Sequence, residues 1–495
     1  MTDSPEETLD PADWQEFRQL GHRMVDDMLD WLEHLRERPV WQPVPDSVRA
    51  ALDRPLPRAP EGAERAYEEF RTQVLPYPMG NAHPRFWAWV MGTGTPLGVL
   101  AEMLAAAMNP NMGGGEHAPN HVEAQVIRWC KEMLGYPLSA SGLLVSGGSM
   151  ANLVALAVAR HTRAGVDVRR DGVRAAAGRL TVYGSREAHS SVQKAVEILG
   201  LGSESLRLAP VNGEYEVDVA ALVRMLREDR AAGAIPICIV GNLGTVNTGA
   251  IDDLDALADV AAAERVWLHV DGAFGALAAL VPEYAARTRA MARADSVAFD
   301  LHKWMYMPFE AGCVLVRDAE AHRRTFSVFP DYLARSTRGV AAGELWLSEY
   351  GVQLSRGFRA LKVWMSLKEH GIDRYARLVR QNIEQARYLA DLVRAAPDLE
   401  LMAPVPLNVV CFRWAGPGLD DTTLDAINQE LLLTLHESGV AVPSNALLGG
   451  RFAIRVAITN HRSRRDDFEL LVREVRRRGT ECAESLQLKG APSGL

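Results

Sequence analysis

Four short segments each place a residue able to do chemistry at the end of an apolar run. The first, residues 143–152, has the pattern of a strand, a glycine turn and the start of a helix. Gly147 and Gly148 let the backbone approach a ligand closely, and Ser149 with the free N–H groups of the first helical turn could bind an anion. The segment matches neither a P-loop nor a dinucleotide-binding fingerprint, and by itself a tight turn without a ligand explains it equally well.

The other three segments supply a carboxylate, an amine and a flat ring. Asp271 ends an apolar run, where a carboxylate is unfavourable unless it is paired, so it could hold a proton on a heterocyclic nitrogen or serve as a cap. Lys303 follows another run, where loss of water favours the neutral amine that forms a Schiff base; a surface lysine is the alternative. The ring of His189 could stack on an aromatic cofactor, although a structural role is favoured for one histidine taken alone.

Together, the anion-binding turn, the ring, the carboxylate and the lysine fit one cofactor, pyridoxal 5′-phosphate (PLP). Its phosphate would lie at the helix N-terminus, and its pyridine ring would lie on His189. Its ring nitrogen would meet Asp271, and its aldehyde carbon would form a Schiff base with Lys303. A protonated pyridine stabilises a carbanion at the substrate α-carbon. The sequence therefore predicts PLP chemistry.

These groups need a sheet whose strands end at one edge. Between about residues 86 and 320, apolar runs alternate with helical patterns, which is typical of a mostly parallel sheet covered on both faces. Ligands bind at the carboxyl ends of such strands. The expected strands are residues 143–145, 180–183, 235–240, 266–270, 296–299 and 312–316, and the expected helices are residues 151–160, 191–199, 217–229 and 254–263.

The two ends of the chain differ from this central part. Residues 13–36 have apolar side chains at helical spacing, whereas the prolines between residues 39 and 60 argue against a helix or a central strand there. We expect this arm to pack on a partner subunit. The C-terminal part has the pattern of a smaller α/β unit with a strand at 451–458, a helix at 464–478 that Gly479 ends, and a frayed polar tail.

Composition limits the class of protein. The 495 residues are 48% apolar and 24% charged with a net charge of −9, which is ordinary globular composition and argues against a nucleic-acid or anionic-membrane binder. The N-terminus lacks the pattern of a signal peptide, and no apolar run reaches the ~20 residues of a membrane span. Five scattered cysteines without a CxxC pair indicate reduced thiols in the cytoplasm, and the 13 histidines show no metal-ligand spacing, so no metal is expected.

The chain resembles the group II PLP-dependent decarboxylases, which act on aromatic L-amino acids, histidine, glutamate or cysteine sulfinate. The resemblance covers about residues 10–480 and implies the aspartate-aminotransferase-like fold, PLP fold type I. It rests on seven segments in family order: residues 83–86 (His-Pro-Arg-Phe), 146–149 (Ser-Gly-Gly-Ser), 151–152 (Ala-Asn), 188–191 (Ala-His-Ser-Ser), 269–271 (His-Val-Asp), 302–304 (His-Lys-Trp) and 330–333 (Pro-Asp-Tyr-Leu). It implies a homodimer built from an N-terminal helical arm (1–85), a large PLP-binding domain (86–370), a small C-terminal domain (371–480) and a tail (481–495).

The resemblance also assigns roles to residues of this sequence. Lys303 is then the Schiff-base lysine and Asp271 the partner of the pyridine nitrogen. His189 lies on one face of the cofactor ring and Ala273 beneath the other. The remaining residues that it implies, which hold the phosphate or orient the lysine, are Gly148, Ser149 and His302.

Tyr332 bears on the reaction type. The matching tyrosine of the family lies on a mobile loop, reaches the site of the neighbouring subunit and protonates the α-carbon of the quinonoid carbanion after CO2 leaves. A positioned acid favours the amine as product, whereas related aldehyde synthases have phenylalanine there. We expect decarboxylation of an L-amino acid, with an oxygen-dependent aldehyde synthase or an aminotransferase that uses Arg455 as alternatives. The intact Lys303 disfavours a non-catalytic homologue.

An aromatic substrate is expected from two stretches that match the side-chain pocket of the family. They supply four residues, Trp89, Met91, Gly92 and Met112, which form an apolar wall. The glycines leave room for a large side chain, although aromatic decarboxylases often have threonine in place of Gly92. Apart from Arg85, no cation occurs there to pair with an acidic side chain, which disfavours glutamate and cysteine sulfinate, although a small or acidic amino acid stays an alternative.

Three positions depart from the family pattern. Met150 and Val246 replace residues that are usually acidic and polar, and Asp300 stands where a neutral asparagine or serine is common. A carboxylate so close to a phosphate is unfavourable unless it turns away. Asp300 is therefore not assigned to phosphate binding, and the phosphate contacts stay open.

Overall fold

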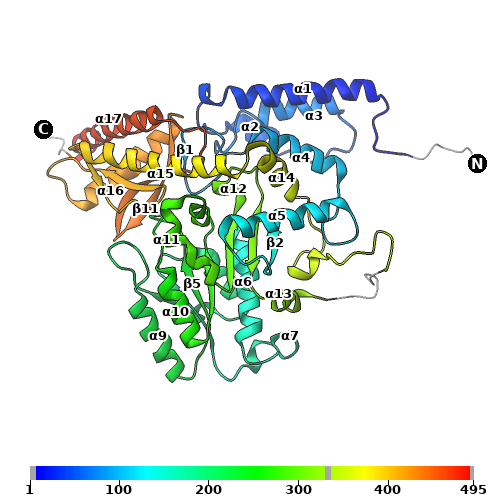
Figure 1. Cartoon of the computed structure of the whole chain (residues 1–495). Coiled ribbons are helices and arrows are strands. Elements are labelled where there is room, and N and C mark those ends of the chain that lie inside the picture. The colour runs from blue at the N-terminus through cyan, green and yellow to red at the C-terminus, as the bar shows by residue number, and fades with distance from the viewer. Residues whose placement is uncertain (1–6, 329–335, 491–495) are drawn as a thin grey trace, which may run out of the picture.

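A seven-stranded sheet forms the centre of the computed structural model, which describes residues 7–328 and 336–490 (Figure 1). Its strand order is β2-β8-β7-β6-β5-β3-β4. β3 to β7 run parallel, and β8 is antiparallel to both of its neighbours. The strands are β2 (Ser141–Val145), β3 (Leu180–Ser185), β4 (Leu206–Ala209), β5 (Ile235–Asn242), β6 (Trp267–Asp271), β7 (Ser296–Asp300) and β8 (Gly312–Val316). The six predicted strands are confirmed, and β4 was missed because it is a short, half-exposed edge strand.

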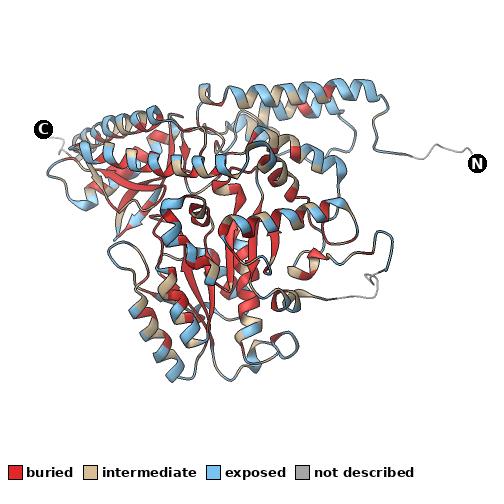
Figure 2. Cartoon of the chain, viewed as in Figure 1, coloured by how far each residue is buried: buried red, intermediate tan, exposed pale blue. Residues whose placement is uncertain are grey.

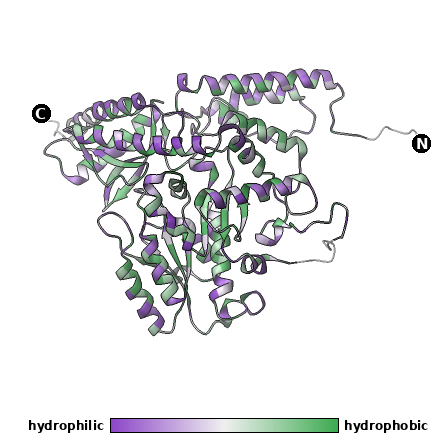
Figure 3. Ribbon diagram, viewed as in Figure 1, coloured by the Kyte–Doolittle hydropathy of each residue, from purple (hydrophilic) through white to green (hydrophobic). Residues whose placement is uncertain are grey.

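Helices cover both faces of this sheet, as the alternating pattern predicted. Side chains of successive strand residues point to opposite faces, so Leu143 and Val145 pack in one cluster and Leu144 in another. The first cluster includes α6 (Gly148–Arg163), α8 (Ser190–Ile198) and α13 (Ala319–Phe326), and the second includes α5 (Ala118–Leu134), α9 (Val219–Ala231) and α10 (Leu254–Glu264). Apart from the half-exposed edge strand β4, the strands of this sheet are accordingly buried and largely hydrophobic (Figures 2 and 3).

A second, five-stranded sheet forms the C-terminal unit, in the order β1-β11-β12-β10-β9. Its strands are β1 (Phe86–Trp87), β9 (Leu399–Leu401), β10 (Val409–Trp414), β11 (Val442–Leu448) and β12 (Arg451–Ala457), and its helices are α15 (Ile372–Ala395), α16 (Asp421–Glu437) and α17 (Arg465–Gly490). The prediction that Gly479 ends the last helix is wrong, because α17 continues to Gly490. A Cβ at position 479 would overlap the indole of Trp414, so this glycine permits a close approach rather than a helix end.

The α-helices of the N-terminal segment, from residue 7 onward, are α1 (Trp14–Glu33), α2 (Asp46–Leu52) and α3 (Ala63–Glu69). Asp13 caps α1 by accepting hydrogen bonds from the next turn. The expectation that the proline-rich stretch excludes a helix is wrong, because α2 fits between Pro45, which is its N-cap, and Pro55. Tyr67 donates to Asp27 (2.6 Å) and joins α3 to α1, so the two helices lie side by side (Figure 1).

The remaining helices connect these parts. They are α4 (Pro96–Met108), α7 (Val168–Asp171), α11 (Ala285–Thr288), α12 (Leu301–Trp304) and α14 (Ala360–His370). α14 packs against α4 and α5, and α12 carries the predicted lysine directly after β7. Among the described helices, none has the length and apolar character needed to cross a membrane.

Candidate active site

The residues predicted to do chemistry meet at the carboxyl edge of the large sheet. β6 ends at Asp271, Lys303 lies on α12 just after β7, and His189 is the N-cap of α8 beyond β3. Two cavities adjoin there and share Asp271, Ala273, Lys303 and His189. One, of about 380 Å³, contains the glycine turn at the start of α6; the other, of about 240 Å³, opens toward the small sheet.

A chain of hydrogen bonds fixes the carboxylate of Asp271. Asn152 donates to its Oδ2 (2.8 Å), and the backbone N–H of Ala273 donates to its Oδ1 (3.1 Å). The amide oxygen of Asn152 lies 2.9 Å from Nε2 of His269, whose Nδ1 lies 2.9 Å from the hydroxyl of Ser296. Burial lowers the pKa of His269 to about 4, so this ring is neutral and Nε2 can donate to Asn152. The carboxylate is thereby aimed into the cavity.

His189 is held in the same network by Ser191. The backbone N–H of Ser191 donates to Nδ1 of His189 (3.1 Å), and the Ser191 hydroxyl lies 2.7 Å from the same nitrogen. Asn152 donates its second amide hydrogen to that hydroxyl (2.9 Å). Burial lowers the pKa of His189, so the ring is neutral and its remaining nitrogen, Nε2, carries the proton. A flat neutral ring therefore lines both cavities.

Lys303 forms an ion pair with the residue that the sequence had left unassigned. Its Nζ lies 3.0 Å from Oδ2 of Asp300, which is buried at the end of β7. His302 accepts a hydrogen bond at Nδ1 from the backbone N–H of Ala311 (3.2 Å), and burial lowers its pKa, so it adds no charge. Lys303 is half-buried and lines both cavities.

The glycine turn leaves space where a phosphate would lie. A Cβ at Gly148 would lie 3.0 Å from Oδ2 of Asp300 and 3.5 Å from the Cβ of Ala273, and one at Gly147 would lie 3.3 Å from Cε1 of His302. Any side chain would thus fill the space above the first turn of α6, where backbone N–H groups lack helical partners and Ser149 is exposed. The turn, Asp271, Lys303 and the flat ring of His189 together fit PLP.

The expected substrate pocket is only partly formed by the residues named for it. Trp89 lines the second cavity and has a left-handed backbone (φ 52°). Neither Met91, Gly92 nor Met112 lines the two cavities among the described residues. Met112 is fully buried in the main core, so it cannot present its side chain to a partner's site.

Gly92 has a structural reason to be glycine. Its N–H donates to the carbonyl oxygen of His302 (3.0 Å), and a Cβ there would overlap that oxygen. Gly92 thus lets the chain pack against the backbone beside Lys303 and leaves no extra room for substrate.

Arg455 of β12, which the sequence suggested only as a carboxylate clamp, lines the second cavity and binds backbone carbonyls of two other segments. Its Nε donates to the carbonyl of Val246 (2.8 Å) and its Nη1 to the carbonyl of Trp89 (2.9 Å) and the hydroxyl of Ser444 (3.2 Å). Burial lowers the pKa of this guanidinium. Arg455 therefore ties the Trp89 segment to the small sheet. Its contacts join segments far apart in sequence, so spacing could not reveal them.

Tyr332, the predicted proton donor, lies outside the described residues.

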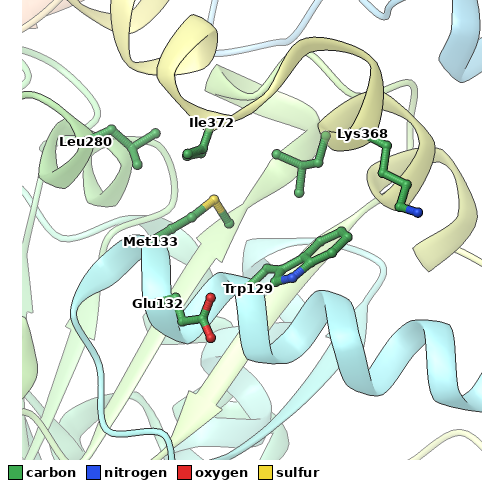
Figure 4. Close-up of a pocket in the computed structure, with 7 residues that line it drawn as sticks. Trp129, Glu132, Met133, Leu280, Lys368 and Ile372 are labelled. Atoms are coloured by element: carbon green, nitrogen blue, oxygen red, sulfur yellow. The ribbon is translucent and has the colours of Figure 1, made fainter.

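A separate hollow of about 490 Å³, drawn in Figure 4, is lined by Trp129, Glu132, Met133, Leu280, Leu367, Lys368 and Ile372. Lys368 lies over the ring of Trp364, 4.2 Å from its centre, so this amine packs on the surface rather than at a strand end. This hollow lacks the grouping seen around Lys303.

Comparison with known proteins identifies the family. A family profile described as "Pyridoxal-dependent decarboxylase conserved domain" matches residues 45–415. An aromatic-L-amino-acid decarboxylase of Bacillus atrophaeus is 34% identical over 475 residues, covering 95% of this chain and 97% of the relative. A phenylacetaldehyde synthase of Petunia hybrida is 28% identical over 467 residues, covering 91% of each chain.

A solved structure agrees with these matches. The structure of Oryza sativa TDC with PLP and tryptamine superposes with a TM-score of 0.88 at 27% identity, covering 96% of this chain and 99% of the other. The predicted fold type I and the predicted PLP cofactor are thereby confirmed, and the geometry of the two cavities fits that cofactor. The chain belongs to the pyridoxal-dependent decarboxylase family.

Proposed function

We propose that this chain uses PLP to decarboxylate an aromatic L-amino acid to its amine and CO2. One observation carries the proposal: Lys303, Asp271 and His189 surround two joined cavities, one at the anion-binding turn and one walled by Trp89. The relatives named as an aromatic-L-amino-acid decarboxylase and as TDC with tryptamine support it.

The side chains divide the work between holding the cofactor and directing the reaction. When bound, PLP supplies an electron-withdrawing ring that accepts the electron pair left as CO2 departs. Asp271 keeps a proton on the pyridine nitrogen, and Asn152 holds its carboxylate in place. Lys303 offers the amine where the two cavities meet, and His189 and Ala273, which line both cavities, would hold the cofactor ring between them. The first turn of α6, with Gly148, Ser149 and His302 beside it, would receive the phosphate.

The second cavity suits an aromatic rather than an acidic side chain. Trp89 is more than half exposed at this cavity, and Val90 and Phe274 add apolar surface. Besides Lys303, Arg455 is the one cationic side chain among the described residues that line it. Its Nε and Nη1 donate to four oxygen acceptors, whereas its Nη2 has no partner in the described part of the chain. That one free nitrogen could pair with the α-carboxylate that every amino acid carries, so a second carboxylate, on the side chain, would lack a partner of its own.

Tyr332 is proposed to donate the proton that makes the amine. A phenol positioned near the α-carbon would protonate it before the α-carbon can react with oxygen and before the proton can go to the cofactor carbon instead. The likeness to a phenylacetaldehyde synthase keeps the oxygen-dependent aldehyde synthase as the second candidate.

The working unit is proposed to be a homodimer in the cytoplasm. Apolar side chains stay exposed on α1 and α4, including Trp14 (60% exposed) and Met108 (59%). A second copy would cover them, with the arm (1–85) reaching across. The division into a large domain (86–370), a small domain (371–480) and a tail (481–495) belongs to the same proposal, with Phe86–Trp87 lying in the small sheet.

One experiment tests the reaction. The purified enzyme with PLP receives L-tryptophan, L-tyrosine, L-phenylalanine or L-glutamate, and CO2, amine, aldehyde and peroxide are measured together. We expect amine and CO2 in equal amounts from an aromatic substrate, no turnover by Lys303→Ala, and a shift toward aldehyde in Tyr332→Phe. Aldehyde and peroxide without amine from the unaltered enzyme would establish the second candidate, and full turnover by Lys303→Ala would refute both.

A further inference from the structure

Asp300 does not turn away from the place where the phosphate of PLP binds. Its side chain is buried, and a Cβ at Gly148 would lie 3.0 Å from Oδ2 and one at Gly147 3.8 Å from Oδ1. Its backbone N–H donates to the carbonyl of Ala273 (2.8 Å), which fixes the residue at the end of β7. The carboxylate thus faces the glycine turn from the opposite side of the cavity.

The two oxygens of this carboxylate are in different situations. Oδ2 lies 3.0 Å from Nζ of Lys303 and 3.8 Å from Nε2 of His302. Oδ1 is buried and has no hydrogen-bond partner among the described residues. A buried oxygen without a donor is unusual, and it lies at the surface that an anion must approach.

Lys303 is the one charge around this cavity that offsets Asp300 among the described residues. No other side chain in that described lining is a cation, because His302 and His189 are neutral. Asp271 is reserved for the pyridine nitrogen. Glu310 also lines the cavity, but it pairs with Arg359 (2.6 Å) and is almost half exposed. A phosphate would therefore meet backbone N–H groups, hydroxyls and one buried carboxylate.

We propose that Asp300 sets the strength of cofactor binding in this chain: its carboxylate holds the amine of Lys303 before PLP arrives and repels the phosphate that enters beside it. The inference rests on PLP binding at this site. An asparagine of the same shape would keep the fold and replace the repelling oxygen by a hydrogen-bond donor. The natural chain accordingly binds PLP less tightly than the Asp300→Asn variant.

The test measures binding rather than turnover. Cofactor-free protein, prepared by dialysis against a carbonyl-trapping amine, is titrated with PLP and, separately, with pyridoxal, which lacks the phosphate. In Asp300→Asn we expect the dissociation constant of PLP to fall by at least about ten-fold, the size expected when a repulsive charge becomes a donor to an anion. The dissociation constant of pyridoxal should change by less than about three-fold, because pyridoxal lacks the phosphate that Asp300 repels and reports the release of Lys303 alone.

Glu310→Gln is the matched control, since it removes a carboxylate from the same cavity but one that Arg359 already neutralises. It should change PLP binding by less than about three-fold, and thermal unfolding should show that both variants are folded. Three results would overturn the proposal: no tightening of PLP in Asp300→Asn, an equal gain for pyridoxal, or an equal gain in Glu310→Gln. Failure of the unaltered chain and of both variants to bind PLP at all would instead overturn the proposed function.

Discussion

Replacing Asn152 by leucine removes the link between Asp271 and the buried histidine behind it. The amide donates one hydrogen to Oδ2 of Asp271 (2.8 Å) and the other to the hydroxyl of Ser191 (2.9 Å), while its oxygen lies 2.9 Å from His269. Leucine has nearly the same shape and makes none of these bonds. The backbone N–H of Ala273 still reaches Asp271, so the carboxylate keeps one of its two donors.

The expected loss follows from the bond to the carboxylate. A hydrogen bond to a charged group contributes about 1.5–3 kcal/mol, and about 1.4 kcal/mol corresponds to a factor of ten in rate. Asn152→Leu should therefore lower kcat/KM for the aromatic substrate by roughly 10- to 150-fold. Ser296→Ala, two bonds further along the same chain, removes a neutral hydrogen bond to His269 worth about 0.5–1.5 kcal/mol and should cost roughly 2- to 12-fold in kcat/KM. It also removes the acceptor of the Trp267 Nε1–H, which lowers stability rather than the hold on Asp271.

The assay is the initial rate of amine formation at saturating PLP, with thermal unfolding as the check on folding. In Asn152→Leu the bound cofactor should also lose the absorbance characteristic of its protonated pyridine form. A general loss of folding would not change this one spectral feature selectively. A folded Asn152→Leu enzyme within two-fold of the unaltered kcat/KM, or a larger loss in Ser296→Ala than in Asn152→Leu, would refute this account of how Asp271 is held.

Two further predictions concern stability. Burial lowers the pKa of His269 and of His322 to about 4, whereas the unfolded rings take up protons near pH 6.5, so the unfolded state binds more protons between these values. The free energy of unfolding should fall by up to about 1.4 kcal/mol per pH unit for each ring as the pH drops from 6.5 toward 4. Urea unfolding at several pH values should show that this free energy depends less steeply on pH in His322→Gln, and an unchanged pH dependence would contradict the prediction. Gly479→Ala should lower the free energy of unfolding by about 1–3 kcal/mol because its methyl group meets Trp414, and thermal unfolding at or above the unaltered midpoint would show that the contact relaxes at no cost.

Local patterns in the sequence were enough to predict the central sheet. Short apolar runs predicted six of its strands, and the glycine turn, the carboxylate and the lysine that follow three of them predicted the edge at which ligands bind, because each signal lies within a few residues. β4 escaped because its residues are half exposed and carry no continuous apolar run. The small sheet was harder to predict because its strands are short or pair over long distances in sequence. β1 holds two residues and pairs with β11, more than 350 positions further along the chain.

Contacts between distant segments account for what the sequence could not predict in the site. Asn152 reaches Asp271 across 119 positions, and Arg455 reaches the carbonyl of Trp89 across 366, so neither contact leaves a trace in spacing. Met112 and Gly92 show the opposite error. Their segments match a pocket by resemblance, yet the structure uses one to fill the core and the other to let two backbones touch.

Asp300 shows how a departure from a family pattern becomes interpretable only with geometry. From the sequence, a carboxylate beside a phosphate was acceptable only if it turned away. The structure instead directs one oxygen to Lys303 and leaves the other without a donor at the glycine turn. The negative charge of Asp300 therefore has two opposite effects, since it stabilises the free amine of Lys303 and repels the phosphate. Because cofactor binding must release that amine, the same ion pair that favours the cofactor-free chain weakens its hold on PLP.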